Sequence, residues 1–296
     1  MIHNSKKKLA QHFLTSKKIA ERVTDAANIR ATDSILEIGP GKGMLTDALI
    51  ARCPKKIIAV EKDKKLVDFL KKKYSAKDPL RRSEDEASGS APGGKNEKRI
   101  EIIEGDIRTI FNRASTRKKL GKQFKVVANI PYYLTSYLIR LLLKNGLTKP
   151  KSIVFMIQKE VAKRIIARPP NMNLLALSIQ SMGEARIAFF VTKKYFSPQP
   201  KVDSAVIIIE HISDAFFKKI EKEKFFGLLH YGFGNKRKML LPNLSKKIPT
   251  PKNELEKIFA HCNIHIQARA ENLSLEQWKC LFLKIQSSKF KAQNLK

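Results

Sequence analysis

The chain has 296 residues, enough to bury a sizeable core and to form two domains. Its 59 Lys and Arg residues against 27 Asp and Glu residues give a formal net charge of +32, which favours a polyanionic partner such as nucleic acid over an anionic membrane surface. No apolar run reaches the roughly 18 to 20 residues of a membrane span, and the first residues lack an apolar core of signal-peptide length, so we expect a cytoplasmic protein.

The cysteines and histidines give no sign of a metal site. Cys53, Cys262 and Cys280 are scattered without the spacing of metal ligands or of a disulfide framework, which suits a reducing compartment. The six histidines likewise form no ligand pattern, so the sequence predicts no metal.

Helix and strand patterns alternate from the start of the chain. Residues 16–28 place apolar side chains at helical spacing behind a serine that can cap the helix. Strand patterns follow over 34–39 and 56–63, and helical patterns over 44–53 and 64–74 come after them. Such alternation predicts an α/β fold with a mostly parallel, doubly wound sheet.

The same alternation continues to about residue 211. A helix is expected over 134–146, ended by Gly146. The last two strands are separated by a Pro-rich loop, and we expect them to pair antiparallel at one edge of the sheet. The further strands are expected over 99–106, 124–129, 151–158, 185–192 and 203–211.

Two segments depart from this pattern. Residues 75–98 are rich in Ser, Gly, Pro and mixed charge, so we expect a disordered polar insert. After residue 211 the pattern changes to helices with dense lysine. The sequence therefore predicts a first domain over 1–211 and a small all-helical domain over 212–296.

A glycine-rich loop follows the first buried strand. The segment EIGPGKG (37–43) places Gly39 and Gly41 where a backbone can turn tightly and approach a ligand closely. The next strand ends in Glu61, near the offset at which an acid meets ribose hydroxyls, and a further strand ends in Asp106, which suits an adenine amine. Acidic side chains at successive strand ends predict a small-molecule site at the carboxyl edge of the sheet. No Walker lysine and serine follow the loop, which disfavours an ATPase.

Another apolar strand stops at a polar residue. In FKVVANIPYYL the strand is followed by Asn129, Ile130 and Pro131, and then by two tyrosines. Pro131 fixes its own φ and biases Ile130 away from helix, so this backbone should be extended and stiff. Such a segment can hold an amide and carbonyls in place beside an aromatic face. A strand end followed by core tyrosines is the alternative.

These motifs resemble a known family of enzymes. EIGPGKGMLT, VEKD, EGD and NIPYYL occur in the order found in S-adenosylmethionine-dependent methyltransferases that act on adenine amines. Further motifs resemble the rRNA adenine N6,N6-dimethyltransferase family: QHFLTS, IQKEVAKRI, YFSPQPKVDSAV, GFGNKRKML and RAENLSLEQW. The last two, in the helical domain, resemble above all its small-subunit (KsgA-type) branch. The resemblance spans nearly the whole chain except residues 75–98 and about 112–122. It implies a Rossmann-like methyltransferase sheet with a helical C-terminal domain.

The resemblance also implies which residues hold the cofactor, S-adenosylmethionine. Glu61 would meet the ribose and Asp106 the adenine, whereas Gly39 would line the methionine end. The full set would be His12, Leu14, Gly39, Gly41, Glu61, Asp106 and Asn129. Many members have Asn in place of His12, which would change a side-chain contact there but not a backbone contact. Small-subunit enzymes often have Leu for Ile130 and Asn for Tyr133, which leaves room for another rRNA target.

The catalytic group implied by the resemblance is Asn129, Ile130, Pro131, Tyr132 and Phe196. An adenine amine is a poor nucleophile because its lone pair is delocalised into the ring. Hydrogen bonds from that amine to the Asn129 side-chain oxygen and the Ile130 carbonyl would favour an sp3-like nitrogen, with no metal or strong base required. Tyr132 would stack on the target base, with Phe196 on its other face. We assign Tyr133 to packing.

The substrate implied by the resemblance is small-subunit ribosomal RNA. We expect dimethylation of two adjacent adenosines near the 3′ end of 16S rRNA, in the immature small subunit, during ribosome biogenesis. The protein is expected to act as a monomer, away from membranes. Basic residues of the helical domain, including Lys236, Arg237 and Lys238, would contact phosphates, unless they form only a solvated basic face.

Three alternatives stay open at this point. One is a large-subunit rRNA adenine dimethyltransferase of the antibiotic-resistance type. A second is a DNA adenine methyltransferase, which would use a similar Asn/Asp-Pro-Pro-Tyr device with a different recognition domain. The third is a non-catalytic RNA-binding factor for ribosome assembly, although the intact set of Gly39, Glu61, Asp106 and Asn129 argues against lost catalysis.

Overall fold

The computed structural model describes residues 12–75, 99–144, 148–235 and 237–293. The predicted polar insert from residue 76 on, Gly146 and Lys236 therefore lie outside the described residues. The chain divides into two compact units, one of residues 1–162 and 186–212, the other of residues 163–185 and 213–296.

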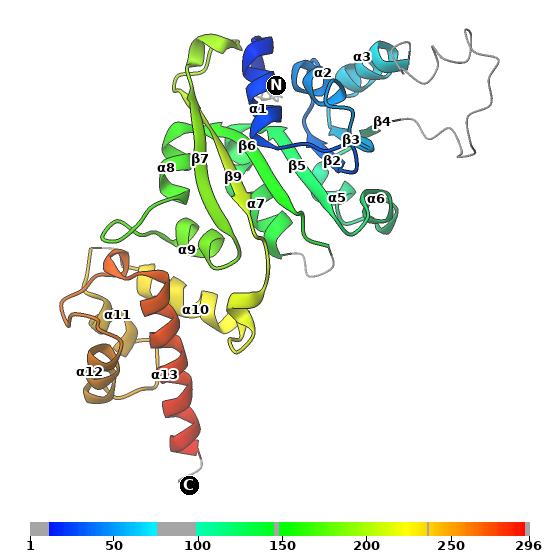
Figure 1. The fold of residues 1–296 in the computed structure, drawn as a ribbon. Helices are drawn as coiled ribbons and strands as arrows, with labels where there is room; N and C mark the ends of the chain where they lie inside the picture. Colours follow the sequence, from blue (N-terminus) through cyan, green and yellow to red (C-terminus); the bar gives the residue numbers. More distant parts are fainter. Residues whose placement is uncertain (1–11, 76–98, 145–147, 236, 294–296) are drawn as a thin grey trace, which may run out of the picture. The chain divides into compact units, whose positions relative to one another are not determined.

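The first unit is built on a seven-stranded sheet with the order β4-β3-β2-β5-β6-β9-β7 (Figure 1). The pairs β2–β3, β2–β5, β3–β4 and β5–β6 are parallel, and β9 runs antiparallel to β6. Its strands are β2 (Ser34–Ile38), β3 (Lys56–Glu61), β4 (Ile100–Glu104), β5 (Phe124–Asn129), β6 (Ser152–Gln158), β7 (Glu184–Val191) and β9 (Ser204–Glu210). This confirms the predicted α/β fold with a mostly parallel sheet, and it places the last two strands together at one edge.

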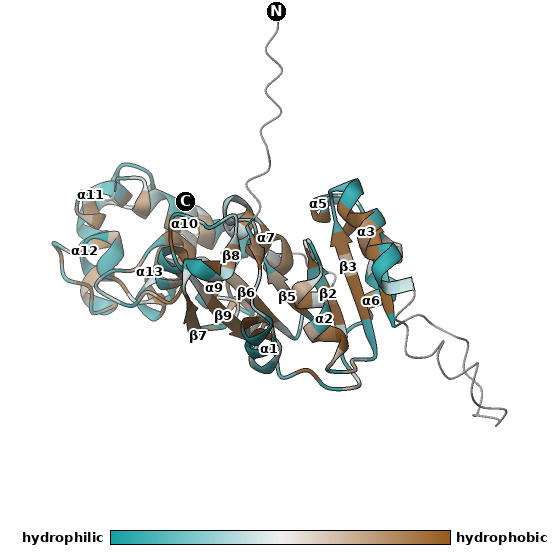
Figure 2. Ribbon diagram, turned by 90° about the horizontal axis from the view of Figure 1, so that it is seen from above, coloured by the Kyte–Doolittle hydropathy of each residue, from teal (hydrophilic) through white to brown (hydrophobic). Residues whose placement is uncertain are grey.

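The central strands are buried because helices cover the sheet. Ile35 and Leu36 of β2 are fully buried, and the strands of the sheet are largely coloured as hydrophobic in Figure 2. On one face the apolar sides of α1 (Lys17–Ala26) and α2 (Met44–Ile50) pack into a single core with residues of β2, β3, β5, β6 and β9. The side chain of Ser16 caps α1 by accepting the N–H of Ile19, at 3.3 Å, as the sequence predicts.

The remaining helices of the first unit follow the strands in chain order. They are α3 (Lys64–Ser75), α5 (Ile107–Ile110), α6 (Ala114–Leu120), the 3-10 turns η1 (Tyr132–Leu134) and η2 (Lys193–Tyr195), and α7 (Thr135–Lys144). Helix α8 (Lys159–Ile165) crosses from the first unit into the second. A separate two-stranded sheet pairs β1 (Phe13–Leu14) with β8 (Phe196–Ser197).

The second unit is helical. Its centre is Trp278, which is fully buried and stacks on Phe233 with ring centroids 5.9 Å apart. Besides the 3-10 turns η3 (Ala215–Phe217) and η4 (Ala270–Asn272), its helices are α9 (Leu174–Gln180), α10 (Lys222–Phe233), α11 (Leu240–Ser245), α12 (Lys252–His261) and α13 (Leu275–Gln293).

Two expectations about this part of the chain were wrong. Residues 163–185 belong to the second unit, not to the first domain, because α9 packs on α10 and Met172 N–H donates to the Glu271 carbonyl at 2.8 Å. Cys262 and Cys280 form a disulfide, since the end of α12 and the second turn of α13 pack together. Sequence spacing does not encode that contact, and the cysteines therefore give no argument for a reducing compartment.

The described residues contain neither a membrane-spanning helix nor a cluster of metal ligands. Within them, no helix combines the length and the apolar character that crossing a membrane requires. Nor do these residues gather three or more His, Cys, Asp or Glu side chains around a position that could hold a metal ion.

Candidate active site

A cleft opens at the carboxyl edge of the sheet. It is formed by β1, the loop after β2, the end of β3, the end of β5 with the residues that follow, and β8. The residues that line it are His12, Phe13, Leu14, Glu37, Gly39, Pro40, Gly41, Lys42, Met44, Leu45, Glu61, Asn129, Ile130, Pro131, Tyr132 and Phe196. All but one of the residues predicted for the cofactor, and all those predicted for catalysis, therefore meet in one cleft.

Glycines give the loop after β2 its shape. Gly39 has φ +67°, and a Cβ atom built there would meet nothing within 4 Å, so the loop leaves open space at this point of the cleft. Gly41 has φ +58°, and its Cβ would lie 2.9 Å from the ring of Phe13. A side chain at either position would be strained, and at Gly39 it would also project into the open space of the cleft.

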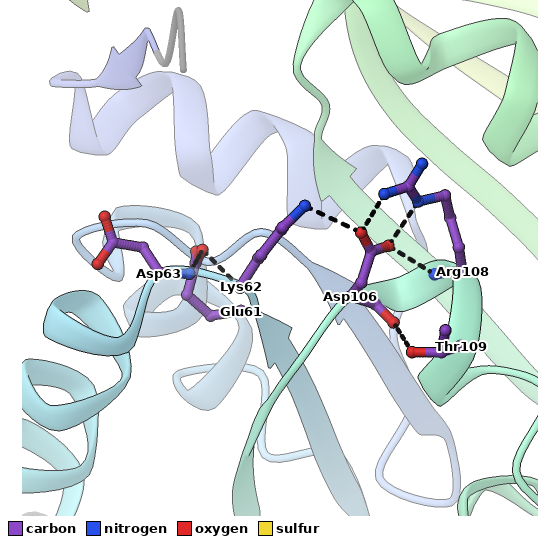
Figure 3. A network of polar contacts seen from close by, with 6 residues as sticks. All are labelled: Glu61, Lys62, Asp63, Asp106, Arg108 and Thr109. Carbon is purple, nitrogen blue, oxygen red and sulfur yellow. Dashed lines mark hydrogen bonds and ion pairs between the residues drawn. The ribbon is translucent and has the colours of Figure 1, made fainter. Parts of the chain in front are cut away.

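Glu61 ties this loop to the end of β3. Its Oε2 accepts the N–H of Gly41 at 3.2 Å. Its Oε1 accepts those of Lys62 at 2.8 Å and Asp63 at 3.0 Å (Figure 3). The side chain is 3% exposed. A buried carboxylate held by three backbone N–H groups shapes the loop and still has one acceptor site, on Oε2, for a ligand in the cleft.

A second buried carboxyl was missed by the sequence analysis. Glu37 of β2 is 1% exposed and lines the cleft. Its Oε2 accepts the Thr46 hydroxyl at 2.8 Å, whereas its Oε1 has no hydrogen-bond partner among the described residues. Burial raises its pKa to about 8, with Asp47 and Glu61 adding to the effect and Lys73 opposing it. An acid inside the apolar strand SILEI is the signal that could have revealed it.

Replacing Glu37 with glutamine should change how stability depends on pH. The folded protein keeps the carboxyl protonated up to about pH 8, while the unfolded chain loses that proton near pH 4.5. The wild-type free energy of unfolding should therefore fall as pH rises between these values and level off above them. Glu37→Gln should flatten this slope and gain a few kcal/mol at pH 8 relative to pH 4, measured by denaturant unfolding. The exposed Asp68→Asn is the control, and an equal effect there would contradict the assignment.

Asp106 is the predicted cofactor residue that does not line the cleft. It caps α5, and its carboxylate binds the guanidinium of Arg108 and, at 3.1 Å, the ammonium of Lys62 (Figure 3). The bond with Arg108, more than any other contact, holds the pKa of Asp106 well below its usual range. The turn still adjoins the cleft, because Gly105 N–H donates to the Glu61 carbonyl at 2.8 Å. Its role toward a cofactor stays a prediction.

Asn129 stands at the end of β5 with its amide fixed. Its Nδ2 donates to the backbone carbonyl of His12 at 3.2 Å. Among the described residues no group donates to its Oδ1, so that atom is available to a ligand N–H. The N–H of Ile130 donates to the Met156 carbonyl at 3.2 Å, which holds the peptide after Asn129 against β6. The stiff backbone predicted for this segment is therefore anchored on both sides.

The small β1–β8 sheet brings distant parts of the chain to the cleft. Leu14 pairs with Phe196, and the ring Nδ1 of His12 lies 2.7 Å from the Pro198 carbonyl. His12 thus uses its backbone for Asn129 and its side chain for the loop at Pro198. The two-residue strands are too short to be read from the sequence, although the motifs that contain them were recognised.

The aromatic residues of the site differ in their placement. Tyr132 lines the cleft, and its hydroxyl lies 2.9 Å from that of Ser204. Burial raises its pKa. Phe196 also lines the cleft and is 5% exposed. The assignment of Tyr133 to packing was wrong, because the side chain is 63% exposed. The 3-10 turn that follows Pro131 directs neighbouring tyrosines to different surroundings.

The predicted phosphate contacts belong to the second unit. Arg237 and Lys238 are exposed in the connection between α10 and α11, and Lys236 lies outside the described residues. Neither Arg237 nor Lys238 is among the residues that line the cleft.

Comparison with known proteins gives a consistent picture. A model of the ribosomal RNA adenine dimethylase family matches residues 2–287. The Ribosomal RNA small subunit methyltransferase A of Dehalococcoides mccartyi is 36% identical over 281 residues, 94% of this chain and 88% of that protein. A dimethyladenosine transferase from Plasmodium falciparum is 25% identical, with a TM-score of 0.73 over 94% of this chain and 98% of that one. The 23S rRNA methyltransferase ErmE shares the fold, with a TM-score of 0.70 over 93% of this chain and 99% of that one, at 22% identity.

Proposed function

The chain belongs to the ribosomal RNA adenine dimethylase family, and on that premise we propose that it dimethylates the N6 amines of adenosines in small-subunit ribosomal RNA. It is an S-adenosylmethionine-dependent methyltransferase. The small-subunit target rests on the name and the 36% identity of the Dehalococcoides relative. The observation that carries the amine chemistry is Asn129, whose Nδ2 is bound by His12 and whose Oδ1 is left for an N–H donor.

The cleft fits S-adenosylmethionine, which supplies a methyl group on a positively charged sulfur. The Oε2 of Glu61 has one acceptor site left for a ribose hydroxyl, and the open space at Gly39 lets a ligand approach the backbone. The unpartnered Oε1 of Glu37 is a buried polar atom in the lining of the cleft, and a hydrogen bond to a bound ligand would satisfy it. We assign His12 and Leu14 to the cleft entrance and Asp106 to the adenine amine.

Asn129 and Ile130 prepare the target amine. We assign the Oδ1 of Asn129 and the carbonyl of Ile130 as acceptors for the two N–H groups of the adenine N6, which favours an sp3-like nitrogen with its lone pair out of the ring. Positioned dipoles of these two acceptors stabilise the charge that develops on that nitrogen. The proton becomes acidic only after methylation, so water can accept it. Pro131 and the bond from Ile130 to Met156 keep the two acceptors in place.

The target base must leave its stack to reach this position. Tyr132 and Phe196 both line the cleft, and we assign them to opposite faces of the base. The contact between the Tyr132 and Ser204 hydroxyls holds the tyrosine ring in one orientation. A pocket that still accepts the amine after one methylation would permit the second.

The proposed reaction also has a specific target site and a cellular location. We place the target at two adjacent adenosines near the 3′ end of 16S rRNA, in the immature small subunit. The protein would act on it as a monomer in the cytoplasm, where subunits assemble. The assignment to the cytoplasm rests only on the proposed ribosomal substrate.

Transfer of labelled methyl groups to three acceptors tests the proposed target. Unmethylated small subunits, large subunits and adenine-containing DNA would each be incubated with the protein and labelled S-adenosylmethionine. We expect label in small-subunit RNA alone. Label in large-subunit RNA or DNA would support the corresponding alternative, and binding to small subunits without label in any acceptor would identify a non-catalytic assembly factor.

The basic residues of the second unit should contribute salt-dependent affinity. Each phosphate contact adds nearly one unit to the slope of log affinity against log salt, so Arg237→Ala with Lys238→Ala should lower that slope by roughly one to two units. Removing two charges from α12, by Lys252→Ala with Lys257→Ala, is the matched control. Equal slopes for both double variants would show that Arg237 and Lys238 lie on a solvated basic face. The full chain is required, because a truncation after residue 212 would strip α10 from α9.

A further inference from the structure

The turn η1 and helix α7, which follows it directly, expose two aromatic side chains beside the cleft. The inner face of α7 is fully buried through Leu138, Ile139, Leu142 and Leu143. Residue 133 of η1 and residues 136, 137 and 140 of α7 are exposed, and side chains three and four residues apart lie on one side of a helix. Tyr133 is 63% exposed and Tyr137 is 42% exposed. Two large rings therefore face solvent where an outward helical face would normally carry polar side chains.

Cations lie at the same edge of the sheet as these rings. Lys62 follows the end of β3, Arg108 follows the end of β4 and Tyr133 follows the end of β5, and these strands belong to the parallel part of the sheet. Lys62 and Arg108 share the single carboxylate of Asp106, which leaves the group with a net positive charge (Figure 3). Exposed aromatic faces and uncompensated positive charge at one edge are the combination that binds unpaired nucleotides.

The position of the rings relates them to the target base. Tyr132 lines the cleft, and Tyr133 follows it directly in η1 but does not line the cleft. A nucleotide held by Tyr133 would therefore be next to the base held by Tyr132. Flipping the target base into the cleft removes its stacking on the neighbouring bases, and an aromatic side chain can cover a face that is exposed in this way.

We propose that Tyr133 and Tyr137 form a stacking platform for an unpaired nucleotide that flanks the target adenosine. Stacking on the two rings would hold the base, and the positive charge of Arg108 and Lys62 at this edge of the sheet would attract the phosphates of the RNA. The proposal rests on the proposed function, since it takes single-stranded RNA at this cleft as its premise. It adds a second base-binding position to the one formed by Tyr132 and Phe196.

Alanine and phenylalanine variants of the full chain test this platform. Affinity for unmethylated small subunits would be measured for Tyr133→Ala, Tyr137→Ala, Tyr133→Phe and Tyr137→Phe. One lost base–aromatic stack should weaken binding roughly 5- to 100-fold in the alanine variants, whereas the phenylalanine variants should bind like the wild type. Phe69→Ala, which removes a ring that is 49% exposed on α3, is the matched control and should bind like the wild type.

Other readouts separate stacking from a structural or cofactor role. The affinity for S-adenosylmethionine and the melting temperature should be unchanged in all five variants. Alanine variants with wild-type RNA affinity would overturn the platform, as would a loss of cofactor affinity equal to the loss of RNA affinity. Weak binding by the phenylalanine variants would overturn the stacking role, because it would show that the tyrosines bind RNA by hydrogen bonds from their hydroxyls. Wild-type protein that binds small subunits without methylating them would contradict the proposed function, while the comparison of variants would still decide the platform.

Discussion

Asn129→Ala should lower the rate of methyl transfer by about 10² to 10³-fold, the usual effect of removing one positioned group that stabilises developing charge. The affinity for S-adenosylmethionine should stay within a few-fold of the wild type, because Oδ1 is assigned to the target amine. Single-turnover kinetics on unmethylated small subunits and calorimetry with the cofactor would give the two numbers.

The variant could also act indirectly, through the bond between Asn129 and the His12 carbonyl. A melting curve separates this effect, since loss of one partly buried hydrogen bond should cost only about 1 kcal/mol. If cofactor affinity falls as far as turnover does, Asn129 serves mainly to hold β1 or the cofactor, and the amine-acceptor role is wrong.

Glu61→Gln should weaken binding of S-adenosylmethionine by about 10- to 100-fold. The carboxylate of Glu61 accepts three N–H groups, and a glutamine cannot accept all of them. Its NH2 group would point at the N–H of Gly41 or at those of Lys62 and Asp63, and two donors cannot bond to each other. The loss of charge-assisted bonds should also reduce the free energy of unfolding by about 1 to 3 kcal/mol. Calorimetry and denaturant unfolding measure these effects.

The chain offers a matched control for this variant. Glu104 pairs with Glu61 in the register of β4 and β3, but its side chain is exposed and does not line the cleft. Glu104→Gln should leave cofactor affinity and stability unchanged. Equal weakening by both substitutions would indicate a general effect of charge at this edge of the sheet, and the specific role of Glu61 would have to be abandoned.

Local patterns were enough to predict most of the sheet and the residues at its carboxyl edge. Continuous apolar runs predict buried parallel strands, and polar or glycine residues at their ends predict a ligand site there. Gly39, Glu61 and Asn129 could therefore be found from the sequence, and all three line one cleft.

Features that depend on tertiary packing could not be predicted in this way. The pairing of Leu14 with Phe196 joins residues 182 positions apart, and nothing local encodes it. The exposure of Tyr133 depends on the direction of one 3-10 turn, and the raised pKa of Glu37 depends on burial that only the assembled cleft creates. Residues 163–185 lie between two parts of the first unit along the chain, and they were therefore assigned to it. In the structure they pack with residues 213–296 instead.

The central claim is that this cleft methylates the exocyclic amine of adenosine, and the identity of the modified nucleoside tests it most directly. Unmethylated small subunits would be treated with the protein and S-adenosylmethionine, and the RNA digested and analysed by mass spectrometry. The account predicts N6,N6-dimethyladenosine with the wild type and almost none with Asn129→Ala. Methylation at a ring nitrogen or a ribose oxygen, or equal N6,N6-dimethyladenosine from the wild type and the variant, would contradict it.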